Sequence, residues 1–225
     1  MNPILLPIVA AVLLGIALWF RYYVATGGES SRWFLYWLIA GSMSALCGAV
    51  SYWTVDPSIS TSFFIAYRAL LSITVFLLFL FARSFSLKTD YTILFCSLPL
   101  QFDIALLVVI NSGLLKKQGN SYVMNFNNAF AVIHISIFAF YALLTIYYFV
   151  MVYLDLRKAG KTREMKQVML FILALVLMIF FMMMEAQIRS WLKVDIPIGG
   201  IGIILGAFII VMALRETADE ATGEM

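Results

Sequence analysis

The sequence is poor in charge and in the residues that most often carry chemistry. Only 12% of its 225 residues are charged, against about a quarter in a soluble domain. It has one histidine and two cysteines, and Cys47 and Cys96 lie in apolar runs without a CxxC spacing. We therefore interpret both cysteines as buried packing residues. So little charge excludes an ordinary soluble domain, and so few ligands argue against a metal centre. We expect no metal and no cofactor.

Several motifs that would identify a membrane enzyme or receptor are also missing. There is no HExxH, and His134 has no motif-level partner with which to activate a serine or cysteine nucleophile. The last apolar run has neither a central lysine for a retinal Schiff base nor the Asn-Pro pair of a G-protein-coupled receptor. The net charge is only +3, with the basic residues in short loops, which argues against nucleic-acid binding. We expect a non-enzymatic protein.

What the sequence does have is hydrophobic residues, which make up 64% of the chain and fall into seven long runs. A helix needs about 20 apolar residues to cross the hydrocarbon core. The chain is therefore predicted to be all-α: one polytopic membrane domain over residues 1–215, with a polar tail over 216–225. Its seven transmembrane helices are expected over 3–20, 33–53, 62–82, 91–111, 128–153, 167–188 and 196–214. The long loop 112–127 contains Gly119-Asn120, which predicts a small hairpin.

The basic residues predict the orientation of these helices. The stretch 155–166, between the fifth and sixth runs, has five of them, and such a loop resists transfer across a bilayer. With this loop inside, the inner side holds ten lysines and arginines and the outer side four. The inner set is Arg21, Arg32, Arg83, Lys88, Arg157, Lys158, Lys161, Arg163, Lys166 and Arg215, and the outer set is Lys116, Lys117, Arg189 and Lys193. We expect a multi-pass plasma-membrane protein with its N-terminus outside and its C-terminus cytoplasmic.

Ionisable residues inside the apolar runs suggest a binding site. There are four of them: Arg68, Asp103, His134 and Glu185. At a rise of about 1.5 Å per residue, each lies roughly 5–12 Å from the outer end of its helix. Ionisable groups at such depths usually face the bundle interior or a watery cavity. We therefore predict an outward-facing ligand pocket, in which the arginine would suit an anion and the carboxylates a cation. With two nearby glutamines, its candidate residues are Arg68, Gln101, Asp103, His134, Glu185 and Gln187.

A purely structural interpretation of the same residues stays open. Arg68 would then pair with Asp103 or Glu185 across helices, and His134 would be a packing residue. Glu185 is also four residues before Arg189, a spacing that allows an ion pair on one helix face.

Small residues in the last run predict close helix packing. Gly202 and Gly206 form a GxxxG spacing, which lets the backbone of another helix approach. The partner is either a neighbouring helix of the same bundle or a second copy of the chain in a homodimer.

The overall layout resembles the N-terminal seven-helix sensory region of bacterial and archaeal membrane histidine kinases. The resemblance covers roughly 5–215 and includes the tryptophan-flanked second run, the long outer loop, the Arg163-x-x-x-Gln167 spacing and the last run opening Asp195-Ile196-Pro197. It implies a sensor that detects a small ligand or a membrane state and signals inward. The kinase modules of that family are absent from these 225 residues. The output is therefore expected from a protein partner or a missing C-terminal module.

Two other functional classes remain open on the residues alone. A transporter of small molecules or ions would use Pro99, beside Gln101 and Asp103, to break the fourth helix. A structural accessory subunit of a larger membrane complex would use the Gly202 face to bind its partner. In all three classes the chain lies in a lipid bilayer.

Overall fold

The computed structural model describes residues 5–23, 28–86, 92–109, 115–118, 121–124, 129–192 and 198–223. These residues form seven helices and one short two-stranded sheet. The helices are α1 (Leu5–Tyr23), α2 (Glu29–Trp53), α3 (Pro57–Arg83), α4 (Thr92–Val109), α5 (Ala129–Lys158), α6 (Thr162–Leu192) and α7 (Ile198–Gly223), and the strands are β1 (Leu115–Gln118) and β2 (Ser121–Met124).

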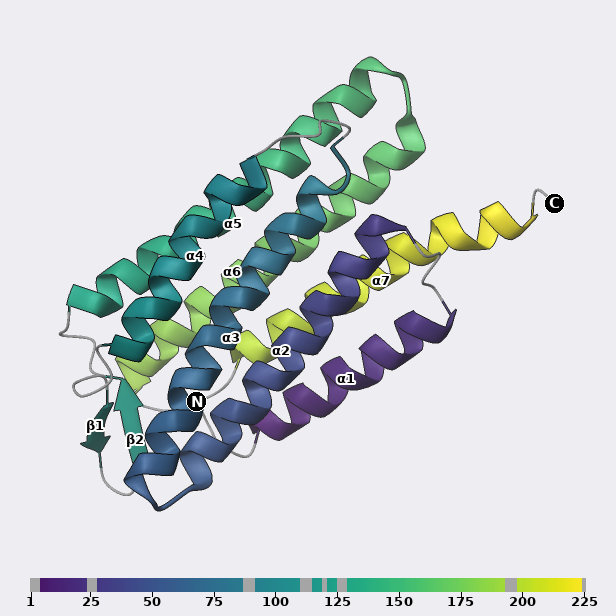
Figure 1. Ribbon diagram of the computed structural model, residues 1–225. Coiled ribbons are helices and arrows are strands. Elements are labelled where there is room, and N and C mark those ends of the chain that lie inside the picture. The colour runs from purple at the N-terminus through teal and green to yellow at the C-terminus, as the bar shows by residue number, and fades with distance from the viewer. Residues whose placement is uncertain are drawn as a thin grey trace.

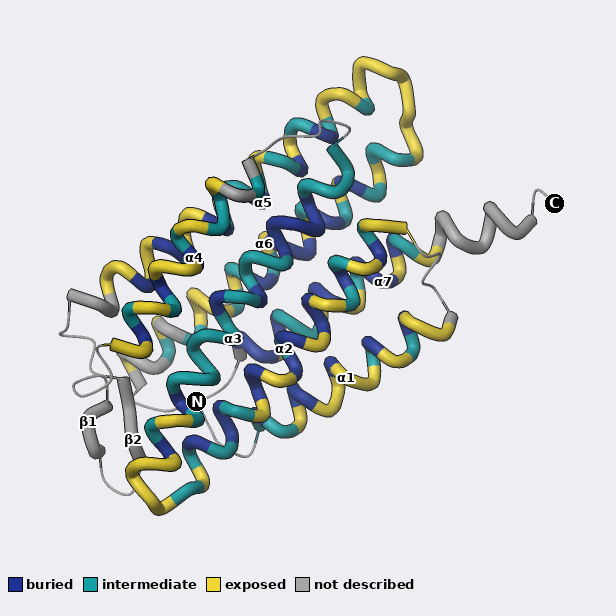
Figure 2. Tube along the Cα trace, viewed as in Figure 1, coloured by how far each residue is buried: buried dark blue, intermediate teal, exposed yellow. Residues whose placement is uncertain are grey.

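Helix length and surface composition identify a membrane protein. Five helices, namely α1, α2, α3, α5 and α6, are long and apolar enough to cross a bilayer, whereas α4 and α7 contain shorter apolar stretches. Large apolar side chains also cover the outer faces of the helices, such as Val109, which is 78% exposed, and Leu143, which is 67% exposed (Figure 2). Exposing such side chains to lipid tails carries no free-energy penalty, whereas exposing them to water is unfavourable.

The helices form a bundle in which sequence neighbours mostly pack side by side (Figure 1). Helices α1, α2, α3, α5, α6 and α7 each contact the next in that order, and α7 returns to contact α1. Helix α4 packs against α3 and α5. This arrangement places α3 next to α2, α4 and α5, so polar side chains of α3 can reach two later helices.

The bundle has two chemically different ends. At one, called the basic end here, α1, α3 and α5 finish and α2, α4 and α6 begin (Figure 1). Nine of the ten residues predicted to be cytoplasmic lie in the described parts of these helices and turns and of α7, and the tenth, Lys88, lies outside the described residues. The opposite, hairpin end carries β1 and β2, and β2 contacts α2.

The predicted hairpin is confirmed. β1 and β2 pair antiparallel, with Leu115 opposite Met124 and Gln118 opposite Ser121. The Gly119-Asn120 pair that suggested it lies outside the described residues.

Helices α5, α6 and α7 extend beyond the predicted apolar runs, into the basic stretch 155–166 and the polar tail 216–225. Helix α5 continues to Lys158 and α6 starts at Thr162, so only three residues connect them, and α7 continues through the tail to Gly223. The length of the apolar runs matches the thickness of the hydrocarbon core of a membrane. Leucine, lysine, arginine and glutamate are good helix formers, so the helices continue beyond these runs. Gly160 ends α5 with a φ of 70°. The N–H of Lys161 donates to Leu156 O at 3.0 Å, which is the Schellman pattern.

The core of the basic half is built from aromatic rings. Phe81 of α3 is fully buried and meets Phe34 of α2 at a centroid distance of 5.3 Å and Phe171 of α6 at 5.4 Å. Phe20 of α1 packs edge-on against Phe34 at 5.0 Å. Edge-to-face packing favours defined ring positions. Helices α1, α2, α3 and α6 therefore meet at this level through aromatic packing.

Helix α3 begins with a conventional cap at the hairpin end. Asp56 accepts hydrogen bonds at 2.8 Å from both the hydroxyl and the N–H of Ser58, and Pro57 occupies the first turn. These hydrogen bonds, that of the hydroxyl first, lower the pKa of the Asp56 carboxyl. Because the pKa is depressed, the cap stabilises α3 above the ordinary carboxyl pKa and is lost as the pH falls through the lowered value.

Candidate functional site

Three polar side chains from three helices meet inside the bundle. Asp103 of α4 is fully buried, Ser72 of α3 is fully buried, and His134 of α5 is 3% exposed. His134 Nδ1 lies 2.9 Å from Asp103 Oδ1 and 3.0 Å from Oδ2, and the Ser72 hydroxyl donates to Asp103 Oδ2 at 2.5 Å. We call these residues the Ser72–Asp103–His134 cluster. Within the described part of the chain, it brings together two of the predicted pocket residues, Asp103 and His134.

The geometry of the cluster constrains the imidazole tautomer. When Asp103 is ionised its oxygens only accept hydrogen bonds, and the Nδ1 atom that faces it then carries the hydrogen. A buried carboxylate in a membrane bundle is costly unless it is paired or hydrogen-bonded. Asp103 is hydrogen-bonded on two sides, by the His134 ring nitrogen and by the Ser72 hydroxyl. The cluster therefore fixes the mutual position of α3, α4 and α5 at this level.

A second polar link joins α4 and α5 beside Pro99. Proline cannot donate a backbone hydrogen bond and crowds the preceding turn of its helix. The Tyr141 hydroxyl of α5 donates to Cys96 O at 2.6 Å and accepts from Leu100 N at 3.0 Å. These are the two backbone groups that would bond to each other in a regular helix. Tyr141 thus satisfies the opened turn of α4, and α4 remains a continuous helix.

Arg68 lies close to the cluster but pairs with no carboxylate in the described residues. It is on α3, one turn nearer the hairpin end than Ser72, and is half-buried. Its guanidinium carbon is 5.3 Å from the ring centroid of Phe64 and 5.2 Å from that of Tyr67. Its Nε atom is buried without a hydrogen-bond partner among the described residues. The alternative in which Arg68 pairs with Asp103 or Glu185 is therefore wrong.

Glu185 has a separate role at the start of α7. Its Oε2 atom accepts a hydrogen bond from Gly199 N at 2.8 Å, so a side chain of α6 caps the first turn of α7. A Cβ atom on Gly199 would lie only 2.7 Å from this oxygen. The residue at position 199 must therefore be small for the cap to form.

The two glutamines predicted for the pocket are exposed. Gln101 donates from Nε2 to Ser97 Oγ at 3.2 Å along the surface of α4, and Gln187 is on the exposed side of α6. Of the six predicted residues, the structure thus gathers Asp103 and His134, places Arg68 one turn away on α3, and gives Glu185 its own contact with α7.

The GxxxG face of α7 packs within the bundle. A Cβ on Gly202 would lie 2.5 Å from Phe181 Cβ of α6, and one on Gly206 would lie 2.6 Å from Met178 Cγ. Both glycines are buried. Of the two partners predicted for these glycines, the structure shows the neighbouring helix.

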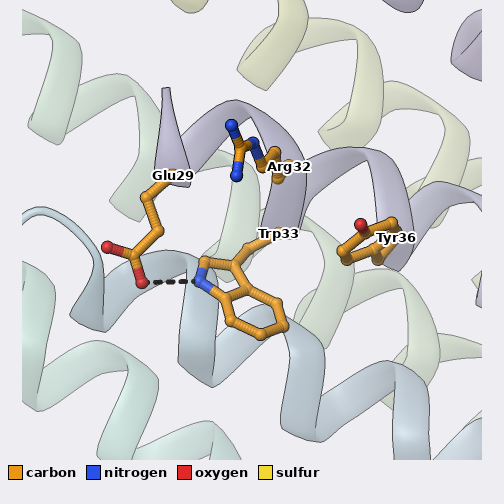
Figure 3. Close-up of a pocket in the computed structure, with 4 residues that line it drawn as sticks. All are labelled: Glu29, Arg32, Trp33 and Tyr36. Carbon is orange, nitrogen blue, oxygen red and sulfur yellow. Dashed lines mark hydrogen bonds between the residues drawn. The ribbon is translucent and has the colours of Figure 1, made fainter. Parts of the chain in front are cut away.

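A surface hollow of about 460 Å³ lies at the basic end, on the first two turns of α2. Its lining residues are Glu29, Arg32, Trp33 and Tyr36. Figure 3 shows the Trp33 indole reaching the Glu29 carboxylate, with Nε1 donating to Oε1 at 3.0 Å. Tryptophan and tyrosine commonly mark the membrane–water interface. This hollow contains none of the six predicted pocket residues and lies at the opposite end of the bundle from the hairpin.

Sequence reasoning missed two contributors and misjudged the cysteines. Ser72 bonds Arg68 O at 3.2 Å, as helical serines commonly do, and also reaches Asp103. Tyr141 was missed, although Pro99 signals that backbone groups of α4 need another partner. Cys47 and Cys96 are half-buried free thiols rather than fully buried residues, because α2 and α4 each turn part of these faces toward the surface.

The Tyr141 link gives a direct prediction. Changing Tyr141→Phe keeps the ring but leaves Cys96 O and Leu100 N without the bridging hydroxyl. The free energy of unfolding in mixed detergent micelles should fall by about 1–2 kcal/mol. Tyr147→Phe is the control, since Tyr147 is on the same helix and 56% exposed, and it should change stability by less than about 0.5 kcal/mol. Equal effects for the two substitutions would contradict the bridging role.

Comparison with known proteins gives no relative. No family model, no curated protein and no solved structure matches the chain. The resemblance to the sensory region of histidine kinases therefore stays a prediction, and the functional argument depends on the residues of this chain.

Proposed function

We propose that the chain is a seven-helix sensory domain of the plasma membrane, with its N-terminus outside and its C-terminus in the cytoplasm. In this proposal it detects a small ligand or a membrane state near the hairpin end. It then signals to a cytoplasmic or membrane partner at the basic end, without catalysing a reaction. The orientation follows from the concentration of lysine and arginine at the basic end.

The observation that carries this proposal is the Ser72–Asp103–His134 cluster. It joins three helices, each connected to the basic end by several further turns. An apolar packing arrangement at the same place would be at least as stable, because buried polar pairs are weak contributors to net stability. A cluster whose hydrogen bonds can rearrange gives these helices two alternative positions, which is what a sensor requires.

The first test measures whether the cluster controls the basic end. Spin labels are attached at Tyr22→Cys of α1 and Lys158→Cys of α5, both exposed, in a chain with Cys47→Ala and Cys96→Ala. The full chain is placed in lipid nanodiscs, and the distance distribution is measured by pulsed electron resonance. Asp103→Asn should shift the distribution by about 1–2 Å or more, the scale of helix movements in switching proteins.

Gln101→Leu is the matched control for this test. It removes a polar group from the same helix, but from an exposed position, and should leave the distance distribution unchanged. A folded Asp103→Asn protein with the wild-type distribution would refute a sensor that operates through the cluster.

Transport is the second candidate, because an intramembrane aspartate–histidine pair also suits a proton relay. The link between Tyr141 and the opened turn of α4 fits the interrupted helices that carriers use. Proton flux into proteoliposomes that is lost in Asp103→Asn would favour transport over sensing. Absence of flux together with the distance shift would favour the sensor.

A further inference from the structure

Arg68 is a cation inside a membrane-spanning helix for which the described part of the chain supplies no anion. It lies between Phe64 and Ser72 in α3, a helix long and apolar enough to cross a membrane. A charged group at such a depth is costly unless it is neutralised or reaches water. Among the described residues, the buried Asp103 is by contrast bound by Ser72 and by His134.

The carboxylates of the polar sites described above have other partners. Asp103 is bound by Ser72 and by His134. Glu185 caps α7 through Gly199 N, and Asp56 caps the start of α3 through Ser58. What Arg68 does have is two aromatic rings, Phe64 and Tyr67, on which its guanidinium rests. Each such contact contributes about 0.5–2 kcal/mol but supplies no counter-charge.

The direction of the side chain indicates where an anion would enter. Side chains of a helix point toward its N-terminus. The N-terminus of α3 is at the hairpin end, and the guanidinium of Arg68 indeed lies over the preceding turn, at the Phe64 ring. Beside Arg68, α3 and α4 pack through an apolar contact in which Phe64 and Leu107 are buried.

We propose that Arg68 binds the anionic oxygen group of an amphiphile, a carboxylate or a phosphate whose apolar part lies along α3 and α4. A planar guanidinium binds both groups through paired hydrogen bonds. The amphiphile enters from the hairpin end, the predicted outer side. This inference names a ligand class for the sensor proposed above and depends on that proposal for its biological meaning. The contact itself can be tested without it.

Two sources offer this chemistry, and the experiment separates them. The full chain is purified with phosphatidylcholine as the only lipid. In one arm, retention of phosphatidylglycerol is measured by native mass spectrometry against phosphatidylcholine. In the other, octanoate is titrated calorimetrically as a soluble carboxylate. Each arm compares the wild type with Arg68→Gln, Arg68→Lys and the control Lys161→Gln, an exposed cation of the basic end that lies 3.7 Å from Glu164.

We expect Arg68→Gln to weaken binding at least about tenfold in one arm, and Arg68→Lys to weaken it less, because it keeps the charge without the planar fork. Lys161→Gln should bind as the wild type does. Loss confined to phosphatidylglycerol identifies a lipid headgroup, and loss confined to octanoate identifies a free carboxylate. Binding that is undetectable or independent of Arg68 in both arms overturns the proposal.

Stability without ligand provides an independent criterion. If the protein supplies no counter-charge to Arg68, Arg68→Gln loses only the contacts with the Phe64 and Tyr67 rings, and the melting temperature in phosphatidylcholine should fall by no more than about 15 °C. A larger fall would show an anionic partner within the protein and overturn the inference. The spin-label test uses no anion, so failure of one experiment leaves the other interpretable.

Discussion

Replacing Gly202 by alanine is expected to destabilise the bundle by about 1–3 kcal/mol, although it adds a single methyl group. The added Cβ would lie 2.5 Å from Phe181 Cβ, which is much closer than two carbon atoms can approach. Because both atoms are fixed to their backbones, no rotamer change removes the contact, so α6 and α7 must separate. Small residues at such crossings stabilise membrane bundles by allowing close packing, and overpacking costs about this much. Unfolding in mixed micelles provides the measurement.

Gly15→Ala is the control for this substitution. Nothing lies within 4 Å of a Cβ added at Gly15, so the change should be neutral or stabilising by up to about 1 kcal/mol, the helix preference of alanine over glycine. A similar loss at both positions would mean that the effect is not one of helix crossing.

Two double substitutions test which atoms of α6 obstruct the added methyl groups. At Gly206 the nearest obstacles are side-chain atoms of Met178, including Cγ at 2.6 Å. Met178→Ala removes them and should rescue Gly206→Ala. At Gly202 the obstacle is Phe181 Cβ itself, which alanine retains, so Phe181→Ala should not rescue Gly202→Ala. Rescue in both pairs would contradict the geometry of this crossing.

The helices could be predicted from the sequence because the thickness of the hydrocarbon core sets the minimum length of an apolar run that can cross it. The residues at which the helices end could not be predicted. The helices that contain the predicted spans 128–153 and 167–188 are longer, namely Ala129–Lys158 and Thr162–Leu192. Charged residues end an apolar run, but they can still be part of the helix. The turn between them depends on Gly160, whose positive φ is a property of the three-residue connection.

The sequence identified the ionisable residues of the candidate site but not which of them contact one another. Arg68, Asp103, His134 and Glu185 stood out because ionisable residues are rare in apolar runs. Depth along a helix is one coordinate, and the sequence contains no information about the rotation of each helix. Rotation decides that Asp103 faces His134, that Gln101 faces outward and that Glu185 faces Gly199. A grouping by depth therefore combined residues of the α3–α4–α5 cluster, of the contact between α6 and α7, and of the exposed surface.

The other large effect is expected at Asp103. Asp103→Leu removes the group that receives hydrogen bonds from Ser72 and His134, and leaves a buried imidazole whose Nδ1–H has lost its acceptor. The free energy of unfolding should fall by about 2 kcal/mol or more. Breaking a buried pair costs about 3–5 kcal/mol in soluble proteins, and polar contacts within membrane bundles contribute less. Gln101→Leu, at an exposed position on the same helix, should change stability by less than about 0.5 kcal/mol.

The double substitution Asp103→Leu with His134→Leu distinguishes packing from function. Replacing both partners removes the unsatisfied group, so at least half of the stability lost in Asp103→Leu should return. Strictly additive losses would mean that the two residues do not act as a pair. If stability returns while the spin-label distances at the basic end stay shifted from those of the wild type, stability alone does not account for the cluster. Its contribution is then to set the relative position of α3, α4 and α5, the property that a sensor uses and a passive bundle does not need.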